Sequence, residues 1–259
     1  MEYIRNNKFK DEFKKLESIY IFPLGDVHYG SATSNYREFE KYLELGSSLD
    51  NAYFIFMGDL MESAGRTSPG MSQFTQDILP QEQYDWVIKT LTPIKHKSLI
   101  FHGANHERRV QITTGIDISK NQAHELGIRY VPFSSIMRIK LKKCAYNIHS
   151  MHGSAGSILS HTKIKAHKDA TAHIEGVDIY LMGHVHFNHT EEIIIRKPNI
   201  KEKRIDKIKI YKIMTGHFLE WDNSYAEEKS YNPLPLGAPI IKLNGLEREI
   251  KVMSIEDFK

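Results

Sequence analysis

The 259-residue sequence contains a single cysteine, Cys144, and no long run of apolar residues. A lone cysteine cannot form a disulfide within the chain, so nothing in the sequence indicates an oxidising compartment. No segment approaches the roughly 20 apolar residues that a membrane-spanning helix needs, and the polar N-terminus lacks the apolar centre of a signal peptide. The sequence therefore predicts a cytoplasmic protein with no membrane segment.

Strong net charge is also missing, because the formal charge at pH 7 is only +3. This is too weak to indicate nucleic-acid binding by itself. Positive charge is nevertheless concentrated between residues 196 and 209, where only Glu202 and Asp206 are acidic. The basic residues are Arg196, Lys197, Lys201, Lys203, Arg204, Lys207 and Lys209. Such a run is either a solvated loop and strand face or a surface for a polyanion.

Apolar runs at residues 19–24, 52–57 and 98–102 are typical of buried strands, and each ends at a glycine. Residues 36–49 and 81–91, between these strands, carry apolar side chains at helical spacing. Alternation of strand and helix predicts right-handed crossovers and a largely parallel sheet, with ligands at its carboxyl edge.

The second half of the chain is richer in strands. Further strands are predicted at residues 137–141, 146–151, 178–182, 190–195, 208–214, 239–243 and 249–253, with a helix at 160–174. We therefore expect an α/β fold in which two sheets pack together with helices outside. The whole chain, residues 1–259, is expected to form one domain, because clusters of polar residues from both halves are useful only if they fold together.

Seven side chains of metal-ligand type lie in five clusters at or near the ends of predicted strands: Asp26, His28, Asp59, Asn105, His152, His184 and His186. Carboxylate, imidazole and amide oxygen suit Mn, Fe or Zn, and the absence of thiolate ligands favours hydrolysis over electron transfer. Each residue alone is more often a cap or a surface group, but the set predicts a metal centre. Asp59 is the candidate bridge between two ions, since its two oxygens can bind separately.

The order of the clusters, Asp-x-His, Gly-Asp, Asn-His-Glu, His-Gly and Gly-His-x-His, resembles the calcineurin-like metallophosphoesterases over residues 19–187. The resemblance implies a four-layer α/β/β/α sandwich of two mixed sheets, followed by C-terminal strands over residues 188–259. It implies two groups of ligands that share Asp59: Asp26, His28 and His186 for one ion, and Asn105, His152 and His184 for the other. A hydroxide between the ions would attack phosphorus, and His106 would act as general acid.

Some residues depart from the family pattern or have uncertain roles. Ala104 stands where the family usually has glycine, and the Asp59 cluster lacks the Asp-Arg-Gly ending of serine/threonine protein phosphatases, which argues against that branch. Arg108 and Arg109 are candidates for binding a substrate phosphate, with solvent exposure as the alternative. His217 is a further candidate, with a structural role as its alternative.

The other histidines are assigned structural positions. His161, His167 and His173 are spaced by six, so they do not share one helical face and are predicted to be solvated. His102 and His149 lie within predicted strands and are expected to be hydrogen-bonded in the core.

These patterns predict a phosphoesterase that uses two divalent ions, with Mn the best support for activity in vitro. We favour phosphodiesters, with nucleic acid or a nucleotide as the substrate class, because the basic run begins ten residues after His186. The alternatives are a small-molecule phosphomonoesterase or dinucleotide pyrophosphohydrolase, and a non-catalytic scaffold of the same fold. The oligomeric state and the physiological metal stay open.

Overall fold

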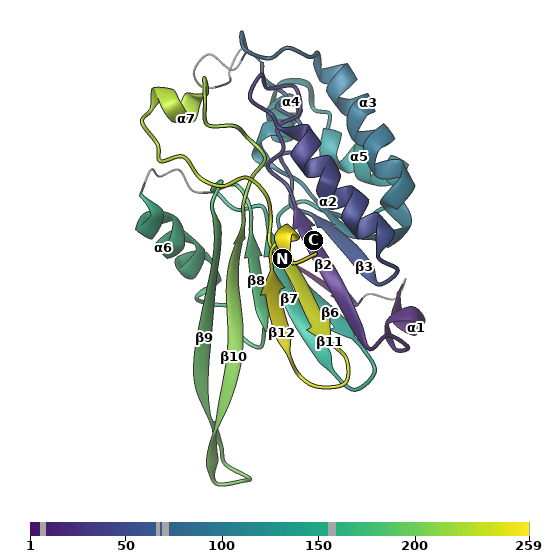
Figure 1. The fold of residues 1–259 in the computed structure, drawn as a ribbon, viewed down its shortest axis with the longest axis vertical. Helices are drawn as coiled ribbons and strands as arrows, with labels where there is room; N and C mark the ends of the chain where they lie inside the picture. Colours follow the sequence, from purple (N-terminus) through teal and green to yellow (C-terminus); the bar gives the residue numbers. More distant parts are fainter. Residues whose placement is uncertain (6–8, 66–67, 69–72, 155–158, 259) are drawn as a thin grey trace.

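The computed structural model describes residues 1–5, 9–65, 68, 73–154 and 159–258 (Figure 1). The strands are β1 Glu2–Arg5, β2 Ser18–Leu24, β3 Ala52–Phe56, β4 Ser98–His102, β5 Tyr130–Val131, β6 Ser134–Lys140, β7 Ala145–Met151, β8 Ile179–Met182, β9 Asn188–Asn199, β10 Arg204–Thr215, β11 Ile240–Asn244 and β12 Ile250–Met253. The helices are α1 Lys10–Phe13, α2 Tyr36–Ser48, α3 Pro80–Leu91, α4 Asn105–Thr114, α5 Ile118–Leu126, α6 Ser160–Thr171 and α7 Tyr225–Glu228, with 3-10 helices η1 Thr92–Lys97 and η2 Ile255–Phe258.

The strands form two six-stranded sheets of mixed direction. One sheet has the order β1-β6-β7-β8-β10-β9, and the other has the order β12-β11-β2-β3-β4-β5. Strands β2, β3, β4 and β5 are parallel, and β11 joins them antiparallel beside β2. Strands β7, β8 and β10 are parallel neighbours, whereas β9 runs antiparallel to β10. Strand β6 pairs antiparallel with β7 and parallel with β1. The predicted arrangement of two mixed sheets is confirmed.

An apolar core fills the space between the two sheets. Ile21 and Ile55 from one sheet belong to the same buried cluster as Ile148, Ile179 and Ile213 from the other, and all five are fully buried. Burying a side chain of this size contributes roughly 1.5–3 kcal/mol. This packing holds the two sheets face to face, so that strands of both sheets end at a common edge of the sandwich.

Helices cover the outer faces of both sheets. Figure 1 shows α2, α3 and α5 on one side of the molecule and α6 on the other. A second cluster packs α2, α3 and α5 against the β2–β5 sheet, and Ile164 of α6 packs against Met182 and Met214 of the other sheet. The layers are therefore α/β/β/α, as the resemblance implied. Within the described ranges, no helix has the length and apolar character needed to cross a bilayer.

The two predicted helices of the first half form with nearly the expected bounds. Helix α2 buries the four residues of its predicted apolar face, Phe39, Tyr42, Leu43 and Gly46. Asn35 caps its N-terminus by accepting from the Glu38 amide at 3.0 Å. Helix α3 buries Val87 and Leu91 of its predicted apolar face, but it also buries Gln83, whose side chain accepts from the Ser63 amide at 3.0 Å. A polar residue thus replaces part of the predicted apolar face, because it supports a loop near the candidate site.

The last two long strands extend further than their sequence pattern predicts. Strands β9 and β10 pair antiparallel over all twelve residues of each, from Asn188 opposite Thr215 to Asn199 opposite Arg204. Figure 1 shows this hairpin projecting beyond the rest of the molecule. The basic run at residues 196–209 occupies its distal half and its turn.

Candidate metal centre

The seven predicted ligands follow the carboxyl ends of strands in both sheets. Asp26 and His28 follow β2, Asp59 follows β3, Asn105 begins α4 after β4, His152 follows β7, and His184 and His186 follow β8. Strands β2, β3 and β4 are parallel neighbours, as are β7 and β8. Their carboxyl ends therefore meet at one edge of the sandwich, where the side chains converge.

Five of the seven residues have a left-handed backbone, which residues other than glycine rarely adopt. The φ angles are 52° at Asp26, 51° at His28, 50° at Asp59, 67° at His184 and 48° at His186. Such strain costs of order 1–3 kcal/mol per residue and persists only where neighbouring structure enforces it. Here the amides of Val27 and His28 both donate to the Asp59 carbonyl, at 2.9 and 3.0 Å. A concentration of strained residues at one place is typical of a functional site.

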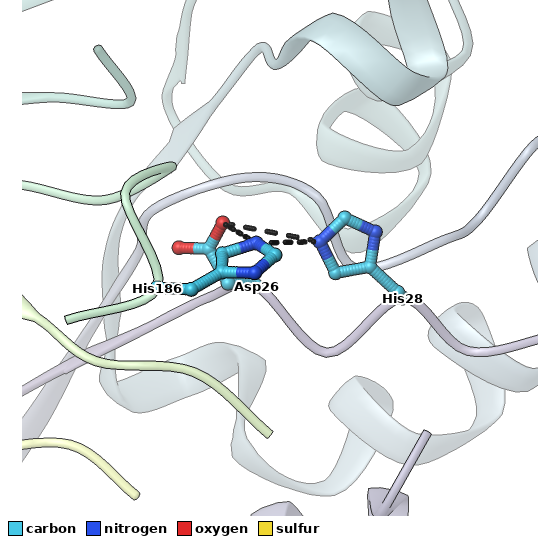
Figure 2. A group of neighbouring side chains, drawn as sticks. All are labelled: Asp26, His28 and His186. Carbon is cyan, nitrogen blue, oxygen red and sulfur yellow. Dashed lines mark hydrogen bonds and ion pairs between the residues drawn. The ribbon is translucent and has the colours of Figure 1, made fainter. Parts of the chain in front are cut away.

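Asp26, His28 and His186 form the first group of potential metal ligands (Figure 2). His186 Nε2 lies 3.3 Å from Asp26 Oδ1 and 3.1 Å from His28 Nε2. The side chains of Asp26 and His28 are buried, and that of His186 is 34% exposed. These are the residues that the resemblance assigned to one ion, and they present one oxygen and two nitrogens to a common point.

Asp59, His152 and His184 form a second group of potential ligands. His152 Nε2 lies 3.2 Å from Asp59 Oδ2 and 2.7 Å from Asn105 Oδ1. His152 Nδ1 lies 2.9 Å from the Met57 carbonyl oxygen, a support that orients the ring and leaves Nε2 facing the group. His184 Nδ1 is buried and has no hydrogen-bond partner in the described part of the chain. A buried orphan nitrogen beside a carboxylate fits a metal ligand.

Asp59 belongs to the second group and also lies near the first. Its Oδ2 is 3.2 Å from His152 Nε2 and 3.8 Å from His28 Nε2, and its Oδ1 accepts from the His106 amide at 3.0 Å. Burial alone would raise the pKa of Asp59, but His152 and His106 outweigh burial and hold the pKa well below its usual range. The carboxylate is therefore ionised and within reach of both groups, as a bridging ligand must be.

Asp26 and His184 connect the groups from the other side. The His184 amide donates to both carboxylate oxygens of Asp26, at 3.1 and 2.9 Å. Burial would raise the pKa of Asp26, yet His186 and His152 lower it overall. Burial lowers the pKa of His184 to about 4, so this imidazole is neutral at pH 7. An ionised carboxylate and a neutral imidazole are the protonation states that bind a metal.

His106, the predicted general acid, is in the first turn of α4 beside Glu62, which was not among the predicted site residues. Glu62 Oε2 lies 3.3 Å from His106 Nδ1 and 3.1 Å from His28 Nδ1. Burial would lower the pKa of His106, but Asp59 and Glu62 raise it to about 9. Asp59 and Glu62 therefore favour the protonated imidazole, and Arg109 opposes them. Glu62 could have been found from its place three residues after Asp59 in the same cluster.

Glu107 is a second residue that the sequence did not single out. Its Oε1 accepts from the amides of Leu60 and Met61, at 2.9 and 3.2 Å. Burial raises the pKa of Glu107 to about 7. The side chain is buried and fixes the loop that follows Asp59, so it supports the site without facing it.

The three candidate substrate-binding residues occupy different positions. Arg109 lies at the site, with Nη2 3.0 Å from His106 Nε2 and Nη1 3.6 Å from Glu62 Oε1. Arg108 is exposed and lies over the Phe133 ring at 5.3 Å, and among the described residues it has no hydrogen bond or ion pair with a predicted ligand. His217 is buried and stacks on His186, with ring centroids 5.4 Å apart. Arg109 and His217 are thus brought to the centre, and Arg108 is not.

Two predictions about other histidines need correction. His167 was expected to be solvated, but it is buried, because it lies one turn after Ile164 on the face of α6 that packs on the sheet. His149 is buried as expected, yet neither of its ring nitrogens has a hydrogen-bond partner in the described part of the chain. His102 fits its prediction, with Nε2 2.8 Å from Ser150 Oγ.

The basic run is close to the site in sequence but not in space. Strand β9 starts two residues after His186 and leads away from the centre for its whole length. At about 3.3 Å per residue, the twelve residues of β9 place the hairpin turn roughly 35–40 Å from the start of the strand. Proximity in sequence therefore does not make these cations part of the metal centre of their own chain.

Comparison with known proteins gives a limited set of similarities. No family model matches the sequence. The DNA polymerase II small subunit of Methanocaldococcus jannaschii is 31% identical over an alignment of 103 residues, and the match covers 35% of this chain and 17% of that protein. The chain thus covers less than a fifth of this relative's length. A conserved uncharacterized protein of Streptococcus pneumoniae TIGR4, described as a predicted phosphoesterase, aligns with a TM-score of 0.38 at 12% identity, over 92% of this chain and 99% of that one.

The fold and the order of the ligand clusters agree with the resemblance to the calcineurin-like metallophosphoesterases. Strands of both sheets end at the edge of the sandwich where the ligand clusters meet. Of the three groups that could hold a metal ion in the described residues, one contains Asp26, His28 and His186 and another contains Asp59, His152 and His184. Asn105, which the resemblance placed in the second group, has its Oδ1 2.7 Å from His152 Nε2. The third, His28, Glu62 and His106, includes the predicted general acid.

Proposed function

We propose that the protein is a two-metal phosphoesterase that hydrolyses phosphodiesters, with nucleic acid as its substrate class, through a single domain spanning residues 1–259. One observation carries the proposal: two groups of ligand atoms, each suited to a divalent ion, lie at one sheet edge, with Asp59 in the second group and near the first. Their carboxylate and imidazole donors suit Mn, Fe or Zn, and we expect Mn to support activity in vitro.

Two divalent ions, when bound, would supply an acidified water and would neutralise the phosphate oxygens. The residues that would hold them are Asp26, His28 and His186 on one side, Asn105, His152 and His184 on the other, and Asp59 between. His106, held by Glu62, would donate its proton to the leaving oxygen. Arg109 is placed to contact a phosphate oxygen beside His106.

Nucleic acid is the proposed substrate class for two reasons. The relative that matches 103 residues of the chain is named as a DNA polymerase subunit, a protein whose name implies contact with nucleic acid. The β9–β10 hairpin also carries a concentration of lysine and arginine that suits a polyanion longer than one nucleotide. A small-molecule phosphomonoesterase would use the same metal groups but would have no use for the hairpin.

The chemistry is tested with a bis-aryl phosphate diester and the matching monoester in the presence of Mn. We expect faster cleavage of the diester. His106→Ala should lower turnover by roughly 10²-fold or more, the scale of a positioned proton donor, and should leave metal content unchanged. His161→Ala is the matched control, because His161 is an exposed histidine on α6. Full activity of His106→Ala on a poor leaving group would exclude its role as acid.

The substrate class is tested by binding of single-stranded DNA or RNA across a range of salt concentrations. Each phosphate contact by lysine or arginine releases counterions, so log Kd should change steeply with log salt. Replacing Lys201, Lys203 and Arg204 by glutamine should flatten the slope by about 0.7 per lost contact without changing hydrolysis of the small diester. Preference for the monoester together with absent or salt-insensitive binding would favour the small-molecule phosphatase.

A further inference from the structure

Strand β9 leaves a long edge of its sheet unpaired. It is outermost in its sheet and pairs only with β10 among the described residues. It has 12 residues, whereas the strands at the other three sheet edges, β1, β5 and β12, have 4, 2 and 4. Proteins usually keep free edges short or covered, because the unpaired N–H and C=O groups attract another strand. The length of the β9 edge therefore points to a partner.

The sequence of this edge is self-complementary in charge. Residues 191–197 are two acids, three isoleucines and two bases in that order: Glu191, Glu192, Ile193, Ile194, Ile195, Arg196 and Lys197. If a second copy runs antiparallel with Ile194 opposite itself, each acid faces a base of the other copy. A pair centred on Ile193 would place both acids opposite isoleucines, and a pair centred on Ile195 would place both bases opposite isoleucines. The charges thus select a single register.

Several groups of this segment are poorly satisfied within one chain. The side chains of Ile194 and Ile195 are 57% and 43% exposed. Arg196 stands directly opposite Lys207 in the hairpin, and like charges in this position are destabilising. Lys197 stands opposite Asp206, but Asp206 is paired with Arg204 at 2.8 Å. No acid among the described residues forms an ion pair with Arg196 or Lys197, in contrast to Arg204 and Lys209 of β10. A partner strand with acids at these positions would satisfy both bases and cover the isoleucines.

Both acids of the segment pair with exposed lysines, and Glu192 also accepts from the buried Tyr211 hydroxyl at 3.1 Å. Glu191 lies 2.7 Å from Lys168 of α6, and Glu192 lies 2.8 Å from Lys209. Exposed pairs of this kind contribute little, typically 0–1 kcal/mol, so both acids remain able to engage a second copy. A nucleic acid on this edge would neutralise the bases but would be repelled by the acids. The pattern therefore favours a second copy of the chain.

We propose that two copies of this chain pair antiparallel along β9, about a twofold axis at Ile194, and join their six-stranded sheets into one continuous sheet. The paired segment is residues 191–197. It ends at Pro198, which has no N–H to donate to a ladder. The interface is isologous, so each acid–base contact occurs twice.

The same register brings the basic hairpin turn of one copy to the metal centre of the other. Asn199 falls opposite His189 of the partner subunit, which is three residues after the partner's His186. Lys201 and Lys203, which lie far from their own metal centre, would extend beside that of the partner. The cations would then act on a nucleic-acid substrate in trans, a consequence that rests on the proposed function, whereas the pairing itself does not.

The pairing is tested by light scattering after size exclusion and by sedimentation, without metal or substrate. Wild type should have a mass of 60 kDa, twice the 30.0 kDa of one chain. Glu191→Lys with Glu192→Lys should be monomeric, and so should Arg196→Glu with Lys197→Glu. A mixture of the two variants should form a heterodimer, and the fourfold exchange in one chain should restore the homodimer.

The matched control is Lys201→Glu with Lys203→Glu, which makes the same change in charge outside the paired segment and should leave the dimer intact. Wild type that stays monomeric, or a dimer that survives both charge reversals, would overturn the pairing. Association that disappears after nuclease treatment would assign the edge to nucleic acid instead. Because none of these measurements uses activity, failure of the proposed function would not affect them.

The consequence in trans is tested in a heterodimer that is enforced by the two charge-reversed interfaces. One chain carries His184→Ala and keeps its basic turn. The other carries Lys201→Gln and Lys203→Gln and keeps its metal centre. If the turn acts in trans, the chain with the intact metal centre meets the intact turn of its partner and retains salt-sensitive nucleic-acid hydrolysis. Loss of that hydrolysis, with cleavage of a small diester retained, would show that the turn acts elsewhere.

Discussion

Replacing Asp59 by asparagine should weaken both metal sites, while removal of a ligand from one group should weaken only one. Asp59 Oδ2 lies 3.2 Å from His152 Nε2 in one group and 3.8 Å from His28 Nε2 in the other. The substitution removes a negative charge shared by both ions. It keeps an amide oxygen that can still accept from the His106 amide, so the fold should persist.

The expected change in Tm follows from the linkage between metal binding and folding. An ion at 100 times its Kd stabilises the folded state by about 2.7 kcal/mol, which raises the Tm of a chain of this size by about 5–10 °C. If Asp59→Asn lowers each affinity by about 100-fold, the gain per ion falls to about 0.4 kcal/mol, or 1–2 °C. His184→Ala should keep the gain from one ion.

The assay is thermal unfolding with and without Mn, paired with elemental analysis of the purified protein. Wild type should contain two ions per chain, and Asp59→Asn should contain substoichiometric metal. Equal Tm in the absence of metal is the control for folding. Two ions retained by Asp59→Asn, with an unchanged Tm gain, would refute the role of Asp59 as bridge.

Three further predictions concern the support of the site and the core. Gly58→Ala should lower the free energy of unfolding in denaturant titration by about 1–3 kcal/mol or more, because φ is 94° and the new Cβ would lie 2.4 Å from Ala104 Cβ. Gly65→Ala, with no atom of the described residues within 4 Å of its new Cβ, should be near neutral, and equal losses would contradict this account. Glu62→Gln should lower kcat by about 10–100-fold at saturating Mn, because the carboxylate orients two imidazoles; an unchanged kcat would exclude that role. Burial lowers the pKa of His167 from 6.5 in the unfolded chain to about 3 in the folded protein. As the pH falls below 6.5, the unfolded chain therefore binds a proton that the folded protein does not bind, and the free energy of unfolding should decrease until the pH reaches about 3. His167→Gln should reduce that loss by up to about 1.4 kcal/mol per pH unit, and an unchanged slope would show that another group titrates.

The convergence of the candidate ligands at one edge could be predicted from the sequence, because strand ends follow from short-range patterns. An apolar run that stops at a glycine and a polar residue defines a carboxyl end, and parallel strands bring such ends together. Asp26, Asp59 and His184 meet for this reason. The face of α2 was equally predictable, because Phe39 and Leu43 recur at helical spacing.

Features that depend on tertiary contacts could not be predicted in this way. His167 is buried because α6 packs that side on the sheet, and the spacing of histidines alone carries no information about this cover. Glu62 acts only through the fold, which brings it to His28 and His106. The basic run seemed close to His186 by count, but ten residues of extended strand span about 33 Å, whereas ten residues of helix span about 15 Å.

The most direct test of the central claim is anomalous scattering from a crystal of the protein grown with Mn. Two peaks are expected about 3.5–4 Å apart, one bounded by Asp26, His28 and His186 and the other by His152 and His184. Asp59 should contact both peaks. A single peak, or two peaks of which only one contacts Asp59, would contradict a shared two-metal centre.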